Sequence, residues 1–305
     1  MDWDLEVDVV CTGAGAAGLA TAISVGVLGG EVFIADCSAG APVPAGGDGM
    51  HPWLGTGVGD TETDAYLASL SSDLGPFRRS VRDIAVPISV VHQPPLASGR
   101  NVAPFVGSRL RDWAARCLAS SYGYLYTRVA NWHTTTLHTA DGELIEVAEI
   151  GSITPDPFDV GGSVLDWLTA EAHDRNVAIE PDCALQRIVF EDGYAVGAVF
   201  TTSDGTLAIR ARNGVTVVAP SSPNVRATAP RQPFTDDATM RVCLVTRYAS
   251  RFGRVELLTS NPLARCAPST CGPANRALHV NMHETQAHSV ASRCGKVHGY
   301  PPIGQ

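Results

Sequence analysis

A strand–turn–helix–strand pattern over residues 7–37 constrains the fold more than any other stretch of the sequence. Valines open an apolar strand, and Gly13-Ala14-Gly15-Ala16-Ala17-Gly18 follows at once in the form G-x-G-x-x-G. An apolar segment of helical length then runs from Leu19 to Leu28 and is broken by two glycines. Residues 31–36 have the composition of a second buried strand that ends on an acid. Together these features predict a βαβ unit with a nucleotide-binding turn.

Each part of this unit has a mechanical reason. Gly13 permits the tight turn, Gly15 lets the backbone approach a pyrophosphate, and Gly18 lets the helix pack closely on the strand. The helix N-terminus offers N–H groups and a partial positive charge to phosphates. The acid at the second strand end can accept hydrogen bonds from ribose hydroxyls. The alternative is a tightly packed βαβ unit that binds nothing. The residues of this unit expected to contact a dinucleotide are Gly13, Gly15, Ala16, Ala17, Gly18, Asp36 and Cys37.

The composition limits the class of protein. A chain of 305 residues, 45% hydrophobic and 17% charged, can bury a large core in one large or two modest domains. A formal charge of -9 argues against a nucleic-acid or anionic-membrane surface. The uncharged run 9–30 has the length of a membrane span, but acids precede it and glycines interrupt it. We therefore expect no integral membrane segment, a cytoplasmic location, and cysteines present as thiols.

The middle of the chain alternates helix and strand signals. Residues 37–59 form a loop rich in Gly and Pro, placed to return over a bound cofactor. Helices are expected over Thr61–Leu74 and over residues 107–120, where apolar side chains recur at helical spacing. Residues 132–150 alternate around Asp141-Gly142, which is a hairpin signal.

A second meander follows a helix expected over residues 164–175, with Ser163 as its cap. A continuous apolar strand over residues 214–219, typical of a parallel sheet, comes after the meander. Beyond the breaker cluster 220–224 the periodicity weakens. The strands of the meander are expected at 184–191, 194–202 and 207–212.

The predicted fold class is therefore α/β. Residues 1–224 are expected to form a Rossmann-like dinucleotide-binding domain, with a parallel sheet, helices and a β-meander. Residues 225–305 are expected to form a small irregular region.

Three segments in this order resemble the flavoprotein-subunit family of fumarate reductase and succinate dehydrogenase, which includes the 3-ketosteroid dehydrogenases. The first, DVVCTGAGAAGLATAISV, is similar to the family's strand–GAGxAG–helix opening. The second, residues 45–53, is similar to its Gly-rich S-G-G-x-x-W segment near the flavin ring. The third, residues 162–218, is similar to the helix, meander and strand that return the chain to the cofactor domain.

This resemblance implies FAD, bound extended, with its adenosine side at the glycine turn and Asp36. It favours FAD over NAD because the second Gly-rich loop and the returning meander are flavoprotein features. It also implies hydride transfer between flavin N5 and an activated C–C bond of a small organic or steroid-like substrate. Further cofactor contacts are expected at Gly46, Gly47, Asp48, Gly49, Ala184, Ala219 and Pro220.

The sequence departs from that family after Ala219. The family's A-T-G-G turn is Ala219-Pro220-Ser221-Ser222 here, and residues 225–305 are too short for both a cap and a second flavin-binding segment. We expect a reduced cap, with the isoalloxazine end open or covered by a second subunit. A non-catalytic FAD-binding carrier, regulator or partner subunit is therefore an alternative, and a Rossmann-type NAD(P) enzyme is a third.

Three residues are candidates for catalysis. His51 lies in the loop expected near the isoalloxazine, and histidine can move protons near neutral pH. Tyr124 and Arg128 could together bind or protonate an enolizable carbonyl. In a strand, Tyr122, Tyr124 and Tyr126 would share one face, and ordinary aromatic packing is the alternative for them.

No metal site is predicted. The C-terminal region contains several Cys and His residues, and a zinc or iron–sulfur site there is the alternative. However, Cys266 and Cys271 lack the tight C-x-x-C spacing, and His279 and His283 would share a helix face only if a helix forms. Ser163 lies in G-G-S and not in G-x-S-x-G, so a serine hydrolase is not indicated.

Overall fold

The computed structural model describes residues 2–36, 58, 60–74, 85–93, 107–128, 134–218 and 238–261. The chain divides into two compact units, residues 1–267 and 268–305, and everything described lies in the first. The domain boundary expected at 224/225 falls outside the described ranges and stays a prediction.

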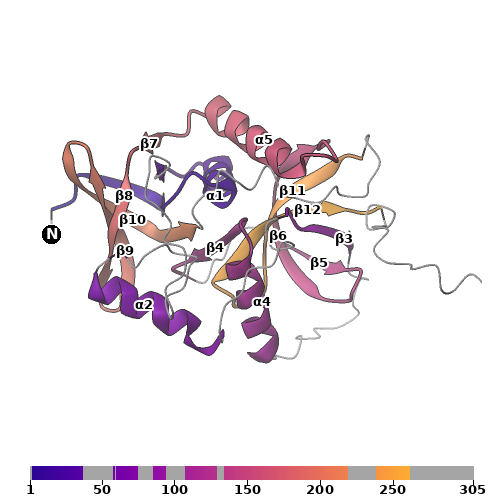
Figure 1. Ribbon diagram of the computed structural model, residues 1–305, viewed down its shortest axis with the longest axis horizontal. Coiled ribbons are helices and arrows are strands. Elements are labelled where there is room, and N and C mark those ends of the chain that lie inside the picture. The colour runs from indigo at the N-terminus through magenta and orange to yellow at the C-terminus, as the bar shows by residue number, and fades with distance from the viewer. Residues whose placement is uncertain are drawn as a thin grey trace, which may run out of the picture. The chain divides into compact units, whose positions relative to one another are not determined.

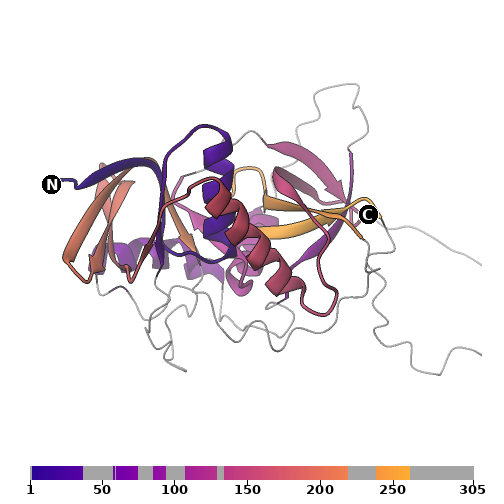
Figure 2. The ribbon, with the colours of Figure 1, turned by 90° about the horizontal axis from the view of Figure 1, so that it is seen from above.

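Four strands pair in parallel at one end of the sheet (Figure 1), in the order β10-β1-β2-β7. The mixed α/β class is thereby confirmed. Helix α1 packs against β1, β2 and β10, and α5 lies beside α1 (Figure 2). The bounds of these elements are β1 Leu5–Cys11, α1 Ala16–Val27, β2 Val32–Asp36, α5 Val160–Asp174, β7 Ile179–Pro181 and β10 Gly205–Val218.

Both helices have ends that the sequence explains. Nine of the twelve residues of α1 are buried, and the helix ends before Gly29, whose φ of 77° suits glycine. Helix α5 begins earlier than predicted because Asp159 caps it, accepting the N–H of Gly162 at 2.8 Å. The prediction that Ser163 caps this helix was wrong. Ser163 lies in the first turn, where its hydroxyl donates to the backbone oxygen of Asp159.

The predicted meander is confirmed as β8 (Ala184–Glu191), β9 (Tyr194–Thr202) and β10, paired antiparallel. The strands expected at 207–212 and 214–219 are, however, one strand. A bulge near Arg212 gives β10 one extra residue against β1. Gly214, at the end of the bulge, has a φ of 124°, which suits glycine.

Five further strands close into a barrel in the order β11-β6-β5-β3-β12, because β11 also pairs with β12. The hairpin predicted at Asp141-Gly142 joins β5 to β6. The strand β4 (Gly123–Tyr126) links the barrel to the parallel strands by pairing with β12 and β10. The barrel strands are β3 Ile88–His92, β5 Thr135–Thr139, β6 Leu144–Ile153, β11 Met240–Thr246 and β12 Phe252–Thr259.

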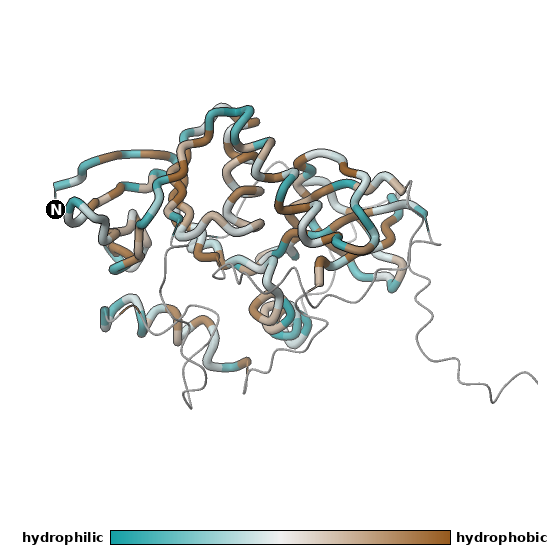
Figure 3. The backbone as a smooth tube through the Cα atoms, turned by 45° about the horizontal axis from the view of Figure 1, so that its top comes forward, coloured by the Kyte–Doolittle hydropathy of each residue, from teal (hydrophilic) through white to brown (hydrophobic). Residues whose placement is uncertain are grey.

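Apolar residues follow one another along several strands (Figure 3), and because successive side chains point to opposite faces, these strands contribute to two hydrophobic clusters. The strands with buried residues in both clusters are β1, β2, β4, β6, β10, β11 and β12. One cluster packs under α1 and α5, and the other fills the barrel and lies under α2 (Thr61–Ser71) and α4 (Gly107–Ala119). Both of these helices were predicted, and α2 continues into a short 3-10 turn, η1 (Ser72–Leu74). Buried Thr63 fixes α2 to β8, since its hydroxyl accepts the N–H of Ile188 at 2.9 Å.

Candidate functional site

The carboxyl ends of β1, β2 and β10 meet at one edge of the parallel strands, and the glycine turn joins β1 to α1 there. Thr12 fixes the start of the turn: its N–H donates to the oxygen of Thr216 at 3.0 Å, and its hydroxyl accepts the N–H of Val218 at 3.2 Å. Gly15 is the N-cap of α1 and supplies no side-chain cap. The first turn also contains no acidic residue, so its N–H groups suit an anionic ligand.

Two glycines of the motif are required by close packing. A Cβ atom on Gly18 would lie 1.9 Å from the backbone oxygen of Gly13, and one on Gly13 would lie 2.7 Å from Val218 Cγ2. The helix therefore starts directly against the turn, as the role predicted for Gly18 requires. This packing holds Ala16 and Ala17, the first residues of α1, beside the end of β1.

Asp36 is the last residue of β2, on the strand adjacent to β1. Its backbone oxygen accepts the N–H of Cys183 at 3.2 Å, which brings exposed Ala184 to the same strand end. The structure thus gathers the predicted residues of the turn, Asp36 and Ala184 at one edge. The predicted site residues outside the described ranges are Cys37, Gly46, Gly47, Asp48, Gly49, His51, Ala219 and Pro220.

The three tyrosines share one face, as predicted, and that face is the core under α1 and α5. Tyr124 is 6% exposed, and its ring lies where a Cβ on Gly253 would be, at 2.4 Å. Burial raises the pKa of Tyr122 and of Tyr126 to about 12 and raises that of Tyr124 further. The phenols are therefore protonated near neutral pH. These positions favour packing, and a catalytic role for Tyr124 stays a prediction.

Arg128 lies two residues beyond the end of β4, whereas Tyr124 lies within that strand. Because β4 runs antiparallel to β10, with Tyr124 beside Val218, the chain after β4 leads away from the carboxyl end of β10. The Cγ of Arg128 is 3.4 Å from where a Cβ on Gly214 would be. Joint recognition of a carbonyl by Arg128 and Tyr124 stays a prediction.

Other predicted features can be checked only over part of the chain. Within the described ranges, no group of three His, Cys, Asp or Glu side chains could hold a metal ion, and the C-terminal Cys and His residues lie outside them. Cys11, Cys117 and Cys243 are buried free thiols. No helix among those described is both long and apolar enough to cross a membrane.

One end of the barrel contains a concave site that was not predicted from the sequence. Its polar residues include Arg241 and Glu149, which lie on strands paired across more than ninety positions of sequence. The near-continuous apolar run 240–246 was the available signal for one of these strands.

The chain matches no protein-family model and no curated protein sequence. The 3-ketosteroid-Δ4-(5α)-dehydrogenase of Rhodococcus jostii RHA1 is 22% identical with a TM-score of 0.30, over 70% of this chain and 46% of that one. A flavocytochrome c3 fumarate reductase is 14% identical with a TM-score of 0.28, over 68% and 33% of the chains. The myxobacterial chondrochloren halogenase, a variant of FAD-dependent halogenases, is 15% identical with a TM-score of 0.26, over 68% and 36%.

Flavin-dependent enzymes thus recur among the similar structures. This chain spans less than half of the length of each of the three proteins. At these TM-scores the likeness establishes neither a shared family nor a shared reaction. A function for the candidate site must therefore be inferred from the geometry of the site itself.

Proposed function

We propose that the chain binds FAD at this edge of the parallel strands and acts as an FAD-dependent oxidoreductase. The observation that carries the proposal is the glycine-capped N-terminus of α1 beside the carboxyl end of β1, with Asp36 ending the adjacent parallel strand. The donor set fits a dinucleotide, because helix N–H groups suit a pyrophosphate and a carboxylate suits a ribose diol. A Rossmann-like interpretation of the four parallel strands belongs to the same proposal.

Bound FAD would supply hydride transfer at its N5 atom. The chain's own contribution at this edge is binding and orientation. The N–H groups of the first turn of α1 would balance phosphate charge, and Asp36 would fix the ribose. The sequence resemblance supports a small organic or steroid-like substrate with an activated C–C bond. Turnover assays with fumarate and with a 3-ketosteroid test that part of the proposal.

The flavin content of the purified protein tests cofactor binding. A Gly15→Val variant should retain roughly a tenth or less of the wild-type FAD, because the new side chain fills the space through which a pyrophosphate approaches. Released flavin is identified by its absorption spectrum and by chromatography, and folding is checked by circular dichroism.

Gly26→Val is the matched control for this variant. Gly26 lies in the same helix, and a Cβ there would meet nothing within 4 Å. Its FAD content should equal that of the wild type. Normal FAD content in a folded Gly15→Val protein would refute the assignment, as would the release of NAD instead of flavin from the wild type.

A second variant tests Asp36. Removing a charge-assisted hydrogen bond, worth about 1.5–3 kcal/mol, should raise the Kd of the Asp36→Ala apoprotein for FAD by about tenfold to a hundredfold. Titration of the apoprotein with FAD measures the change. Exposed Glu180, on the neighbouring strand β7, provides the control Glu180→Ala, which should leave the Kd unchanged. Equal affinities for the two variants would mean that Asp36 does not hold the ribose.

A further inference from the structure

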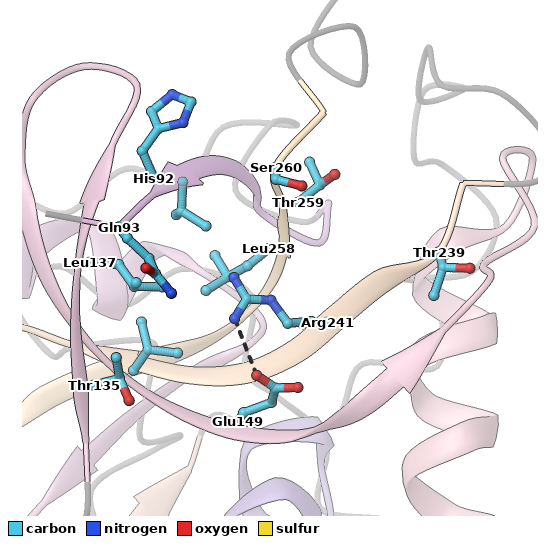
Figure 4. Close-up of a pocket in the computed structure, with 12 residues that line it drawn as sticks. His92, Gln93, Thr135, Leu137, Glu149, Thr239, Arg241, Leu258, Thr259 and Ser260 are labelled. Atoms are coloured by element: carbon cyan, nitrogen blue, oxygen red, sulfur yellow. Dashed lines mark hydrogen bonds and ion pairs between the residues drawn. The ribbon is translucent and has the colours of Figure 1, made fainter. Parts of the chain in front are cut away.

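One end of the five-stranded barrel contains a cavity of about 910 Å³ (Figure 4), and all five strands contribute to its walls. Small-molecule sites occupy roughly 300–1,000 Å³, so the cavity has a suitable size. Strands β10 and β4 separate β12 of the barrel from β1 in the sheet order. The cavity is therefore distinct from the glycine turn.

Buried apolar side chains from four strands form the floor of the cavity. Their exposed fractions are at most 4%, so the floor is part of the packed barrel interior. Polar side chains line the rest of the cavity. The floor residues are Val91, Leu137, Val147 and Leu258, and the polar residues without formal charge include Gln93, Thr135, Thr239, Thr259 and Ser260.

One ion pair lies inside the cavity. Arg241 of β11 and Glu149 of β6 are joined by a contact of 3.2 Å between Nη1 and Oε2, and their side chains are 36% and 49% exposed. Figure 4 shows the guanidinium in the middle of the cavity, between Leu258 and Glu149, whereas His92 points away from it. The pair therefore borders both the apolar floor and the open space.

Both members of the pair have bonding capacity left. Within the described part of the chain, the side chain of each forms its only hydrogen bond and ion pair with the side chain of the other. A guanidinium carries several N–H donors in a planar fork, and a carboxylate has two acceptor oxygens. Arg241 can thus bind a second carboxylate, and Glu149 can accept from a second cation.

We propose that this end of the barrel binds a small zwitterion with an apolar side chain, of the α-amino-acid type. The ligand carboxylate binds Arg241, its ammonium group binds Glu149, and its side chain covers the apolar floor. Two charges on the protein and two on the ligand then each lie next to a charge of opposite sign. A ligand with no net charge also fits a cavity whose formal charges cancel, because neither partner is left with an unpaired desolvated charge.

Calorimetric titration of the 305-residue protein with L-leucine and with L-phenylalanine tests the proposal. The matched probes for L-leucine are 4-methylpentanoate, which lacks the ammonium group, and 3-methylbutan-1-amine, which lacks the carboxylate. Each should bind at least about tenfold more weakly than L-leucine, because it loses a charge-assisted contact. Absence of saturable binding by both amino acids would overturn the proposal, as would equal binding of either one-charge probe.

Two variants test whether L-leucine binds at the ion pair. Glu149→Gln keeps the side-chain shape and removes the charge, and Arg241→Met keeps an unbranched chain of similar length. Each should weaken L-leucine binding by at least about tenfold. Arg210→Met, at an exposed position of β10, is the control and should bind L-leucine as the wild type does. Unchanged binding in either folded cavity variant would overturn the assignment, and equal FAD content in all variants separates this result from the FAD proposal.

Discussion

Replacing Gly18 with alanine is expected to lower the free energy of unfolding by about 3 kcal/mol, the upper end of the usual range for an overpacked site. The added Cβ would lie 1.9 Å from the backbone oxygen of Gly13. A backbone atom cannot rotate away as a side chain can, so the turn or the helix must move. Both are fixed, because Thr12 binds the turn to β10 and most of α1 is buried. Urea denaturation measures the change.

The same substitution at Gly26 provides the control. Gly26 also lies in α1, and a Cβ there would meet nothing within 4 Å. Alanine should raise stability by about 0.5–1 kcal/mol, because glycine loses more backbone entropy in a helix interior. Opposite signs for one chemical change within one helix would isolate the close contact as the cause. Equal stability of the Gly18→Ala protein and the wild type would contradict the close approach of helix and turn.

The features that the sequence predicts well are local ones. The glycine turn, the helix after it and the strand ending at Asp36 follow from residues within one short segment. The Asp-Gly turns at 141–142 and 192–193 were equally predictable, since Gly142 and Gly193 both have a φ of 78°. In both of these Asp-Gly turns, glycine adopts a positive φ that other residues rarely adopt.

The features that were missed depend on pairing between distant segments. Strand β11 pairs with β6, far back in the chain, and closes the barrel through β12. An apolar run indicates burial but does not name its partner. Likewise, alternation placed Tyr122, Tyr124 and Tyr126 on one face correctly, but it could not show that this face meets helix α1.

Replacing Trp113 with alanine should lower the free energy of unfolding by about 3–5 kcal/mol, as expected for truncation of a large core side chain. The side chain is 1% exposed and lies in the cluster that fills the barrel. Its indole N–H donates to the backbone oxygen of Phe252 at 2.9 Å, so truncation also leaves that oxygen without this donor. The ring further contacts three guanidinium groups, at 5.1–5.4 Å from its centroid, which belong to Arg116, Arg247 and Arg254.

Trp113→Phe separates packing from the polar contacts. Phenylalanine keeps an aromatic ring in the cluster but lacks the N–H and attracts cations less strongly, so it should lower the free energy of unfolding by about 1–2 kcal/mol. Denaturation in urea measures both changes in the free energy of unfolding. Urea is used in place of guanidinium chloride because guanidinium ions would compete with the arginines for the ring. An alanine variant as stable as the phenylalanine variant would contradict the packing argument, because the two differ mainly in the ring that fills the space. The size of that gap therefore measures how much the packing of an aromatic ring at position 113 contributes to stability.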